Sequence, residues 1–424
     1  MASSTMSSRE RVRTALEHRQ PDRVPLDLGG SVLTGMHVSS VYRLRQALRL
    51  DPPQTPVKVL DPYQMLGEIQ PDLVEAVGAD VLPIPTPATL FGFRREAWKP
   101  WRLADGTPVL VPGAFNTEPE ANGDILMYPQ GDRSAPASGR MPQGGFYFDE
   151  IVRQPPLDEA RLDPADNMEE FVPIDEAELR YYAEEAGRLA ATTDKALVAG
   201  FCYTSFGDIA MVPAPQLKHP RGIRDIEEWY VSTLTRRDYV YKVFERQCEV
   251  GLENLSRLAR AVGDRIQVTL VTGTDFGAQT APFISPQSYR DLFQPFHKAI
   301  NSWVHEHTRW KTFIHSCGSV VELLPDFIAS GFDILNPVQT AAAGMEPRRL
   351  KERFGERLVF WGGGVDTQKL LSFGTPQEIR AQVRERMEVL GKGGGFVFAG
   401  IHNIQAGVPV ENLLALFEAA RDYR

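Results

Sequence analysis

Residues 311–339 read KTFIHSCGSVVELLPDFIASGFDILNPVQ, with a short apolar run at each end and a helical pattern between them. Ser319 and Glu322 have the spacing of a helix capping box. Gly331 is the type of residue that often follows the end of a helix. Two apolar runs joined by one capped helix indicate two neighbouring strands of a parallel sheet.

The same alternation recurs along the chain and predicts the fold class. Further capping boxes occur at Ser7 with Glu10 and at Thr375 with Glu378. Eight strands alternating with helices predict a closed (β/α)8 TIM barrel. We expect these strands within residues 23–30, 79–84, 195–202, 265–275, 311–318, 332–339, 357–366 and 394–403.

Residues 86–175 have a different texture, with short strand patterns and DG or GD turns around a proline-rich stretch that is typical of a loop. We expect a β-rich insertion here, between the second and third strands and over the mouth of the barrel. With this insertion included, residues 1–424 are predicted to form one domain.

The composition narrows the classes of function. Hydrophobic residues make up 42% of the chain and charged residues 24%, which is ordinary for a globular protein. The net charge is −9 and the basic residues are scattered, which argues against a nucleic-acid partner. Apolar segments of the ~18 residues that span a membrane do not occur, so we expect a cytosolic protein. Three cysteines are too few for a disulfide framework in so long a chain.

Polar side chains end most of the predicted strands, where TIM barrels place their active sites. His315 and Cys317 are two residues apart on one strand, so both face the same side and both can reach one metal ion. Catalytic zinc usually has three protein ligands. His402 is the first candidate for the third, Cys202 is its rival, and Asp275 is a weaker one. A His-x-Cys pair that only packs and hydrogen-bonds at the end of a buried strand remains the alternative.

Several motifs resemble the uroporphyrinogen decarboxylase superfamily, and within it the zinc-dependent, corrinoid-linked methyltransferases. The similar stretches are SSRERVRTALEHRQPDRVP near the start, the His-x-Cys-Gly strand end, GFDILNPVQ, WGGGVDTQ with GTPQEI behind it, and VPVENLLALFEAA. They cover nearly the whole chain apart from residues 86–175. The decarboxylases carry an arginine-rich segment after the first strand, and here that segment reads GGSVLTGMH. Without such cations a many-carboxylate substrate is a poor fit.

In the methyltransferases, the resemblance implies that zinc is bound by the His-x-Cys pair and by a cysteine seven residues before the proline of a Pro-x-Glu-Asn helix start. That proline is Pro409 here, and position 402 holds a histidine. The resemblance therefore implies Zn²⁺ on His315, Cys317 and His402. It also implies methyl transfer between a small-molecule donor or thiol and a corrinoid (cobalamin) cofactor. A cobalamin-binding motif is missing from the sequence, so we expect the corrinoid on a partner protein.

We assign roles to the remaining polar strand ends as hypotheses. Asp275 and Gln279 are expected to orient the substrate or to handle a proton. The expected substrate-binding residues are Tyr203, Asn336, Gln339, Asp366 and Asn403, and Phe206 is expected to form an apolar wall with Tyr203. Asp366 and Asp275 also suit helix capping. The alternative function is a metal-independent decarboxylase or lyase that uses Asp275, and a noncatalytic binding protein is a third. A homodimer is compatible with the sequence.

Overall fold

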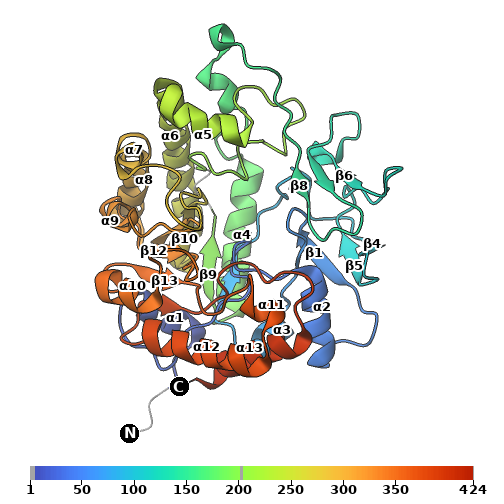
Figure 1. Ribbon diagram of the computed structural model, residues 1–424, viewed down its shortest axis with the longest axis vertical. Helices are drawn as coiled ribbons and strands as arrows, with labels where there is room; N and C mark the ends of the chain where they lie inside the picture. Colours follow the sequence, from blue (N-terminus) through green and yellow to red (C-terminus); the bar gives the residue numbers. More distant parts are fainter. Residues whose placement is uncertain (1–4, 201–203, 424) are drawn as a thin grey trace.

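The computed structural model describes residues 5–200 and 204–423, and its centre is a curled parallel sheet of seven strands (Figure 1). These strands are short and mostly buried, as expected for a parallel sheet with both faces covered, although two of the three residues of β3 are half-buried. In spatial order the strands are β14 (Phe396–Val397), β13 (Val359–Trp361), β12 (Ile334–Asn336), β11 (Lys311–His315), β10 (Val268–Thr272), β9 (Ala196–Ala199) and β3 (Val81–Pro83). The predicted α/β architecture with a parallel sheet is confirmed.

The first predicted strand, within residues 23–30, forms only an isolated bridge between Leu26 and Phe398. Its backbone nevertheless contacts both edges of the sheet. The Asp27 N–H donates to the Phe398 carbonyl at 2.8 Å, and the Asp80 N–H donates to the Leu26 carbonyl at 2.7 Å. Pro25 has no N–H to donate, which limits a regular ladder here. The segment thus links the β14 edge to the β3 edge, consistent with the predicted barrel.

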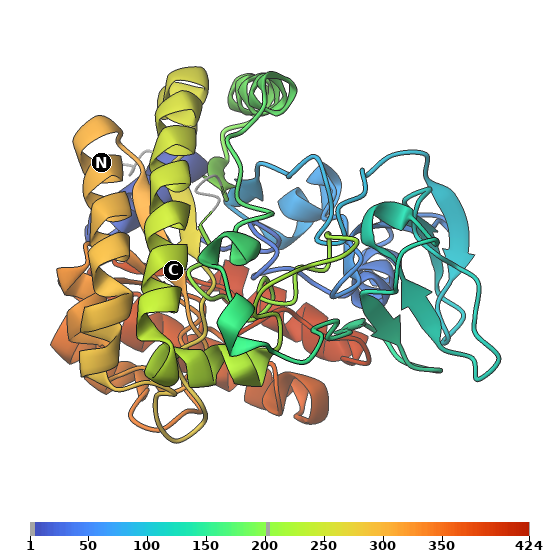
Figure 2. The ribbon, with the colours of Figure 1, turned by 90° about the horizontal axis from the view of Figure 1, so that it is seen from above.

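Helices surround the sheet, and the longest, α6, lies beside α8 (Figure 2). Helix α1 packs Val12 and Leu16 into the apolar cluster inside the sheet, so it covers the amino ends of the strands. The helices are α1 (Ser8–Leu16), α2 (Val38–Ala47), α3 (Pro71–Val77), α4 (Glu176–Thr192), α5 (Ile226–Thr235), α6 (Arg237–Val262), α7 (Pro286–Leu292), α8 (Gln294–His307), α9 (Leu324–Ala329), α10 (Pro347–Phe354), α11 (Leu370–Phe373), α12 (Pro376–Leu390) and α13 (Val410–Asp422). None of the described helices is both long and apolar enough to cross a membrane.

Two of the three predicted capping boxes are present. Ser7 caps α1 together with Glu10, and Thr375 caps α12 together with Glu378. The prediction for Ser319 is wrong, because its Oγ donates to the Ala343 carbonyl at 2.7 Å and α9 begins only at Leu324. The Ser319 hydroxyl thus bonds to a residue that is distant in the sequence, whereas the local pattern predicted that it would cap a helix.

Two small sheets form a separate lobe, seen at the right of Figures 1 and 2. One contains β2 (Leu66–Gly67), β1 (Val57–Asp61), β5 (Pro108–Val111) and β4 (Lys99–Arg102) in that order. The other contains β6 (Ile125–Met127), β7 (Gly139–Met141) and β8 (Asp149–Glu150). Strand β7 lies within the proline-rich stretch, residues 134–145, where we expected a loop. The described part of the chain also contains four short 3-10 helices, η1 (Pro129–Gly131), η2 (Glu159–Arg161), η3 (Pro164–Asn167) and η4 (Gly263–Arg265).

The lobe does not coincide with the predicted insertion. Strand β5 pairs in parallel with β1, which precedes residue 86 by 25 residues or more. The boundary at residue 86 therefore cuts through one sheet, and an insertion limited to residues 86–175 stays a prediction.

Candidate metal centre

Strand β11 places His315 inside the curled sheet, close to the carboxyl ends of the strands. Phe313, two residues earlier on the same face, packs in the interior apolar cluster. In the parallel register His315 pairs with Asn336 of β12, and the Asn336 Oδ1 lies 2.6 Å from the His315 Nδ1. The Asn336 Nδ2 donates to the Trp361 carbonyl at 2.9 Å, which fixes the orientation of the amide. The His315 Nδ1 must therefore carry a proton, and in the neutral form of the ring it is the Nε2 that presents a lone pair.

The loop after β11 holds Cys317 by its backbone. The Cys317 N–H donates to the Asp275 Oδ1 at 2.7 Å, and the Gly318 N–H donates to the Gln339 Oε1 at 2.7 Å. Gly318 has a φ of +83°, and a Cβ there would lie 2.1 Å from the Gly277 carbonyl oxygen. Only glycine fits such a close approach between two loops. As a result, the Cys317 Sγ lies 3.5 Å from the His315 Nε2.

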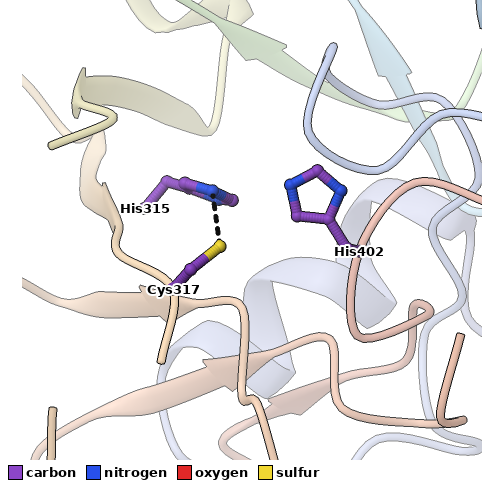
Figure 3. A group of neighbouring side chains, drawn as sticks. All are labelled: His315, Cys317 and His402. Carbon is purple, nitrogen blue, oxygen red and sulfur yellow. Dashed lines mark hydrogen bonds between the residues drawn. The ribbon is translucent and has the colours of Figure 1, made fainter. Parts of the chain in front are cut away.

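His402, in the loop after β14, completes a group of three donors (Figure 3). The rings of His315 and His402 have centroids 5.5 Å apart. One donor atom from each of His315, Cys317 and His402 lies within 4.8 Å of the other two. Zinc–sulfur and zinc–nitrogen bonds of about 2.3 and 2.0 Å at a tetrahedral angle separate the two donors by about 3.5 Å. The observed sulfur–nitrogen distance matches this value, and a side-chain shift on the order of 1 Å brings in the third donor.

The electrostatics of the group favour a bound cation. Burial raises the pKa of the Cys317 thiol well above its ordinary value, and the neighbouring Asp275 raises it further. Burial lowers the pKa of His402 to about 3, and His315 adds to the effect, so the imidazole is neutral. A neutral imidazole is the form that binds a metal, and a metal ion is what allows a buried thiol to ionise. The three side chains therefore fit zinc.

A cavity of about 370 Å³ opens beside Cys317 and His402. Gln279 and Gln339, both predicted site residues, line it, and so does Gln368, which the sequence analysis missed. The structure thus brings these three amides to the candidate metal centre.

Three other predicted substrate residues have their side chains engaged in the fold. Asn336 is fully buried behind His315, which it orients. Asn403 is also fully buried; its Oδ1 accepts from the Gly35 N–H at 2.5 Å and its Nδ2 donates to the Val32 carbonyl at 2.7 Å. The Asp366 Oδ1 caps the following turn by accepting from two backbone N–H groups. In these contacts the side chains hold backbone groups and His315, and the expected substrate-binding roles of the three residues stay predictions.

One of the two residues expected to form an aromatic wall, Phe206, lies in the core. Phe206 is fully buried and packs against Phe244, Phe296 and His297 rather than facing the site. Tyr203, its expected partner in that wall, and Cys202, the rival third zinc ligand, both lie outside the described residues.

Two residues close to Asp275 escaped the sequence analysis. The Tyr230 hydroxyl donates to the Asp275 carbonyl oxygen at 2.9 Å. Burial raises the pKa of Asp208 to about 7, and the charge of Asp275 contributes to the shift. Asp208 lies in the loop after β9, several residues beyond the strand end. A carboxylate so far into a loop carries no strand-end signal in the sequence.

Comparison with known proteins identifies a matching protein family and a solved structure with a similar fold. The family model described as uroporphyrinogen decarboxylase (URO-D) matches residues 145–423. A solved structure of a methyltransferase from Methanosarcina mazei aligns with a TM-score of 0.55 and 17% sequence identity, over 98% of this chain and 99% of that one. The chain is therefore similar to that protein in fold. No curated protein sequence matches the chain.

Proposed function

Because the chain belongs to the uroporphyrinogen decarboxylase family, we propose that it is a zinc-dependent methyltransferase of that family. In this proposal it moves a methyl group between a small-molecule donor or thiol and a corrinoid carried by a separate protein. The observation that carries the proposal is the group of three donors, His315, Cys317 and His402, within 4.8 Å of one another. The fold likeness to a solved methyltransferase supports it.

The residues around the donors fit this chemistry. Zinc, when bound, would act as a Lewis acid on the sulfur or oxygen that gives or receives the methyl group. Asn336 holds the His315 ring with its Nε2 toward the sulfur. Gln279, Gln339 and Gln368 offer neutral amides to orient a small substrate in the cavity. Asp275, whose Oδ1 holds the Cys317 N–H, has a second carboxylate oxygen that can take the proton lost by a substrate thiol.

An exposed apolar group beside the site supports a protein partner. Leu234 is 67% exposed and Phe283 is 53% exposed, and the Phe283 ring lies 5.4 Å from that of Tyr230. Tyr230 in turn contacts Asp275. We place the corrinoid protein over these side chains, where its cobalt would supply or accept the methyl group.

The test is the metal content of the purified full-length protein, measured by mass spectrometry. The variants are His315→Ala, Cys317→Ala and His402→Ala, and Cys248→Ala serves as the control because its buried thiol is on α6, apart from the three donors. We expect about one zinc per chain in wild type and in Cys248→Ala, and loss of zinc in the other three. A metal-free wild type would refute the proposal and favour the metal-independent lyase. Loss of zinc in Cys202→Ala but not in His402→Ala would make Cys202 the third ligand.

A further inference from the structure

A second cavity, of about 290 Å³, lies at the carboxyl ends of β3 and β9, next to the loop that follows residue 28. Its walls are mainly aliphatic, and they include Leu28, Leu66, Ile69, Leu82, Ile84 and Leu270. Small-molecule sites are typically concave, apolar and marked by a few polar groups. A volume of about 300 Å³ is at the lower end of the range for such sites and suits a molecule with about one ring.

Hydrogen bonds with Asn403, the residue after His402, connect the wall of this cavity to the candidate metal centre. Gly35 and Val32 line the cavity, and both are held by the side chain of Asn403. Asn403 follows His402 in the chain. A molecule in the cavity therefore lies near the third donor of the metal centre.

Arg95 is the one cationic side chain among the described residues that line the cavity. Its Nε donates to the Leu60 carbonyl at 2.7 Å, and its Nη1 donates to both oxygens of Thr86. Its Nη2 has no hydrogen-bond partner within residues 5–200 and 204–423. The Nε and Nη1 groups thus fix the guanidinium, while its Nη2 can still donate hydrogen bonds to a ligand.

Asp61 also lines the cavity, but it does not form an ion pair with Arg95. Both carboxylate oxygens of Asp61 accept backbone N–H groups, from Tyr63 and Gln64, at 3.3 Å. Burial lowers the pKa of Arg95, and the charge of Asp61 offsets only part of that effect. A half-buried guanidinium against aliphatic walls is therefore short of an anionic partner, and a carboxylate is the partner that its planar fork matches best.

We infer that this cavity binds the non-reacting part of the substrate, and that this part is an apolar ring or short chain bearing one carboxylate. The assignment to the substrate rests on the proposed methyltransferase function. Binding of the carboxylate to Arg95 does not rest on that function, since none of the three proposed zinc ligands lines the cavity. A single carboxylate is also compatible with the neutral stretch GGSVLTGMH, which provides no cations for a polycarboxylate.

Calorimetric titration of the full-length protein with benzoate, benzamide and benzylammonium tests the inference. We expect benzoate to bind at least tenfold more tightly than the other two. Arg95→Gln should abolish that preference, and Arg95→Lys should keep part of it. Arg94→Gln is the matched control, because Arg94 is the adjacent arginine and is exposed, and it should behave as wild type.

Equal binding of benzoate and benzamide to wild type would overturn the inference. Equal losses in Arg94→Gln and Arg95→Gln would do the same, and so would a preference for benzylammonium, which would identify Asp61 as the recognising group. Circular dichroism establishes that each variant is folded. The titration is repeated with His402→Ala. Benzoate binding that persists in a protein without zinc would show that the carboxylate site does not depend on the metal centre. The carboxylate site and the methyltransferase function can therefore be refuted separately.

Discussion

Removing the amide of Asn336 tests whether the fold prepares His315 for zinc. Asn336→Ala deletes the acceptor of the His315 Nδ1 proton and the donor to the Trp361 carbonyl, both in a fully buried position. Residues that orient a metal-binding histidine typically contribute 10–100-fold to metal affinity, which corresponds to about 1.4–2.8 kcal/mol. We expect a loss of zinc affinity in this range.

The same substitution also lowers the free energy of unfolding of the zinc-free protein. It leaves two buried polar groups without partners, each at about 1–3 kcal/mol. The total is roughly 2–6 kcal/mol. Competition with a chromogenic zinc chelator measures the affinity, and urea unfolding of the zinc-free protein measures the stability.

Asn412→Ala is the matched control for this experiment. Asn412 is 2% exposed and donates two hydrogen bonds, to the carbonyls of Leu371 and Gly374, at 3.0 and 2.9 Å. Its removal should lower stability by a similar amount and leave zinc affinity within about threefold, because it touches none of the three donors. Wild-type zinc affinity in Asn336→Ala would refute the orienting role. An equal loss of affinity in both variants would show that the effect is one of general stability.

Two further predictions concern His402 and Asp27. His402→Cys should keep about one zinc per chain and raise the affinity on the order of tenfold, since thiolate is a strong zinc ligand; unchanged affinity in chelator competition would mean that residue 402 is not a ligand. Burial raises the pKa of Asp27 from 3.8 to about 6, although the Trp361 Nε1 donor at 2.7 Å opposes the shift. The native state thus holds this proton more tightly, so the stability that the group contributes is present below pH 4 and is lost as the pH rises to about 6. The difference between the two pKa values corresponds to at most about 3 kcal/mol of stability. In urea unfolding of the zinc-free protein, wild type should lose up to this amount more than Asp27→Asn between pH 4 and 7, and a constant difference between the two would contradict the buried carboxyl.

Most of the fold was predictable because buried parallel strands are nearly continuous apolar runs. The first strand was only partly predictable. Pro25 lacks the N–H group that a regular ladder needs, and the segment forms only an isolated bridge between Leu26 and Phe398. His315 and Cys317 were predictable as a pair because their spacing of two puts them on one face. The proximity of His402 to this pair was implied by the family resemblance, through its place relative to Pro409.

The rest of the site was hidden from the sequence for a physical reason. Asp208, Gln368 and Arg95 lie in loops, whose paths follow tertiary contacts rather than a periodic pattern. Asn336 and Asn403 were recognised as polar strand ends, but their amides bond to fold elements that sequence spacing does not reveal. A polar residue at a strand end therefore predicts proximity to the site better than it predicts contact with a ligand.

The bridge between Leu26 and Phe398 has a consequence for how the protein is made. The two residues are 372 positions apart, so the first strand leaves the ribosome long before the strand that it joins. Until then, the segment around Leu26 can contact the β3 edge of the sheet, but the β14 edge that it also contacts has not been synthesised. His402 is synthesised just after β14. The three donors of the candidate metal centre thus come together only when nearly the whole chain has been translated, and an incomplete chain cannot bind metal through all of them.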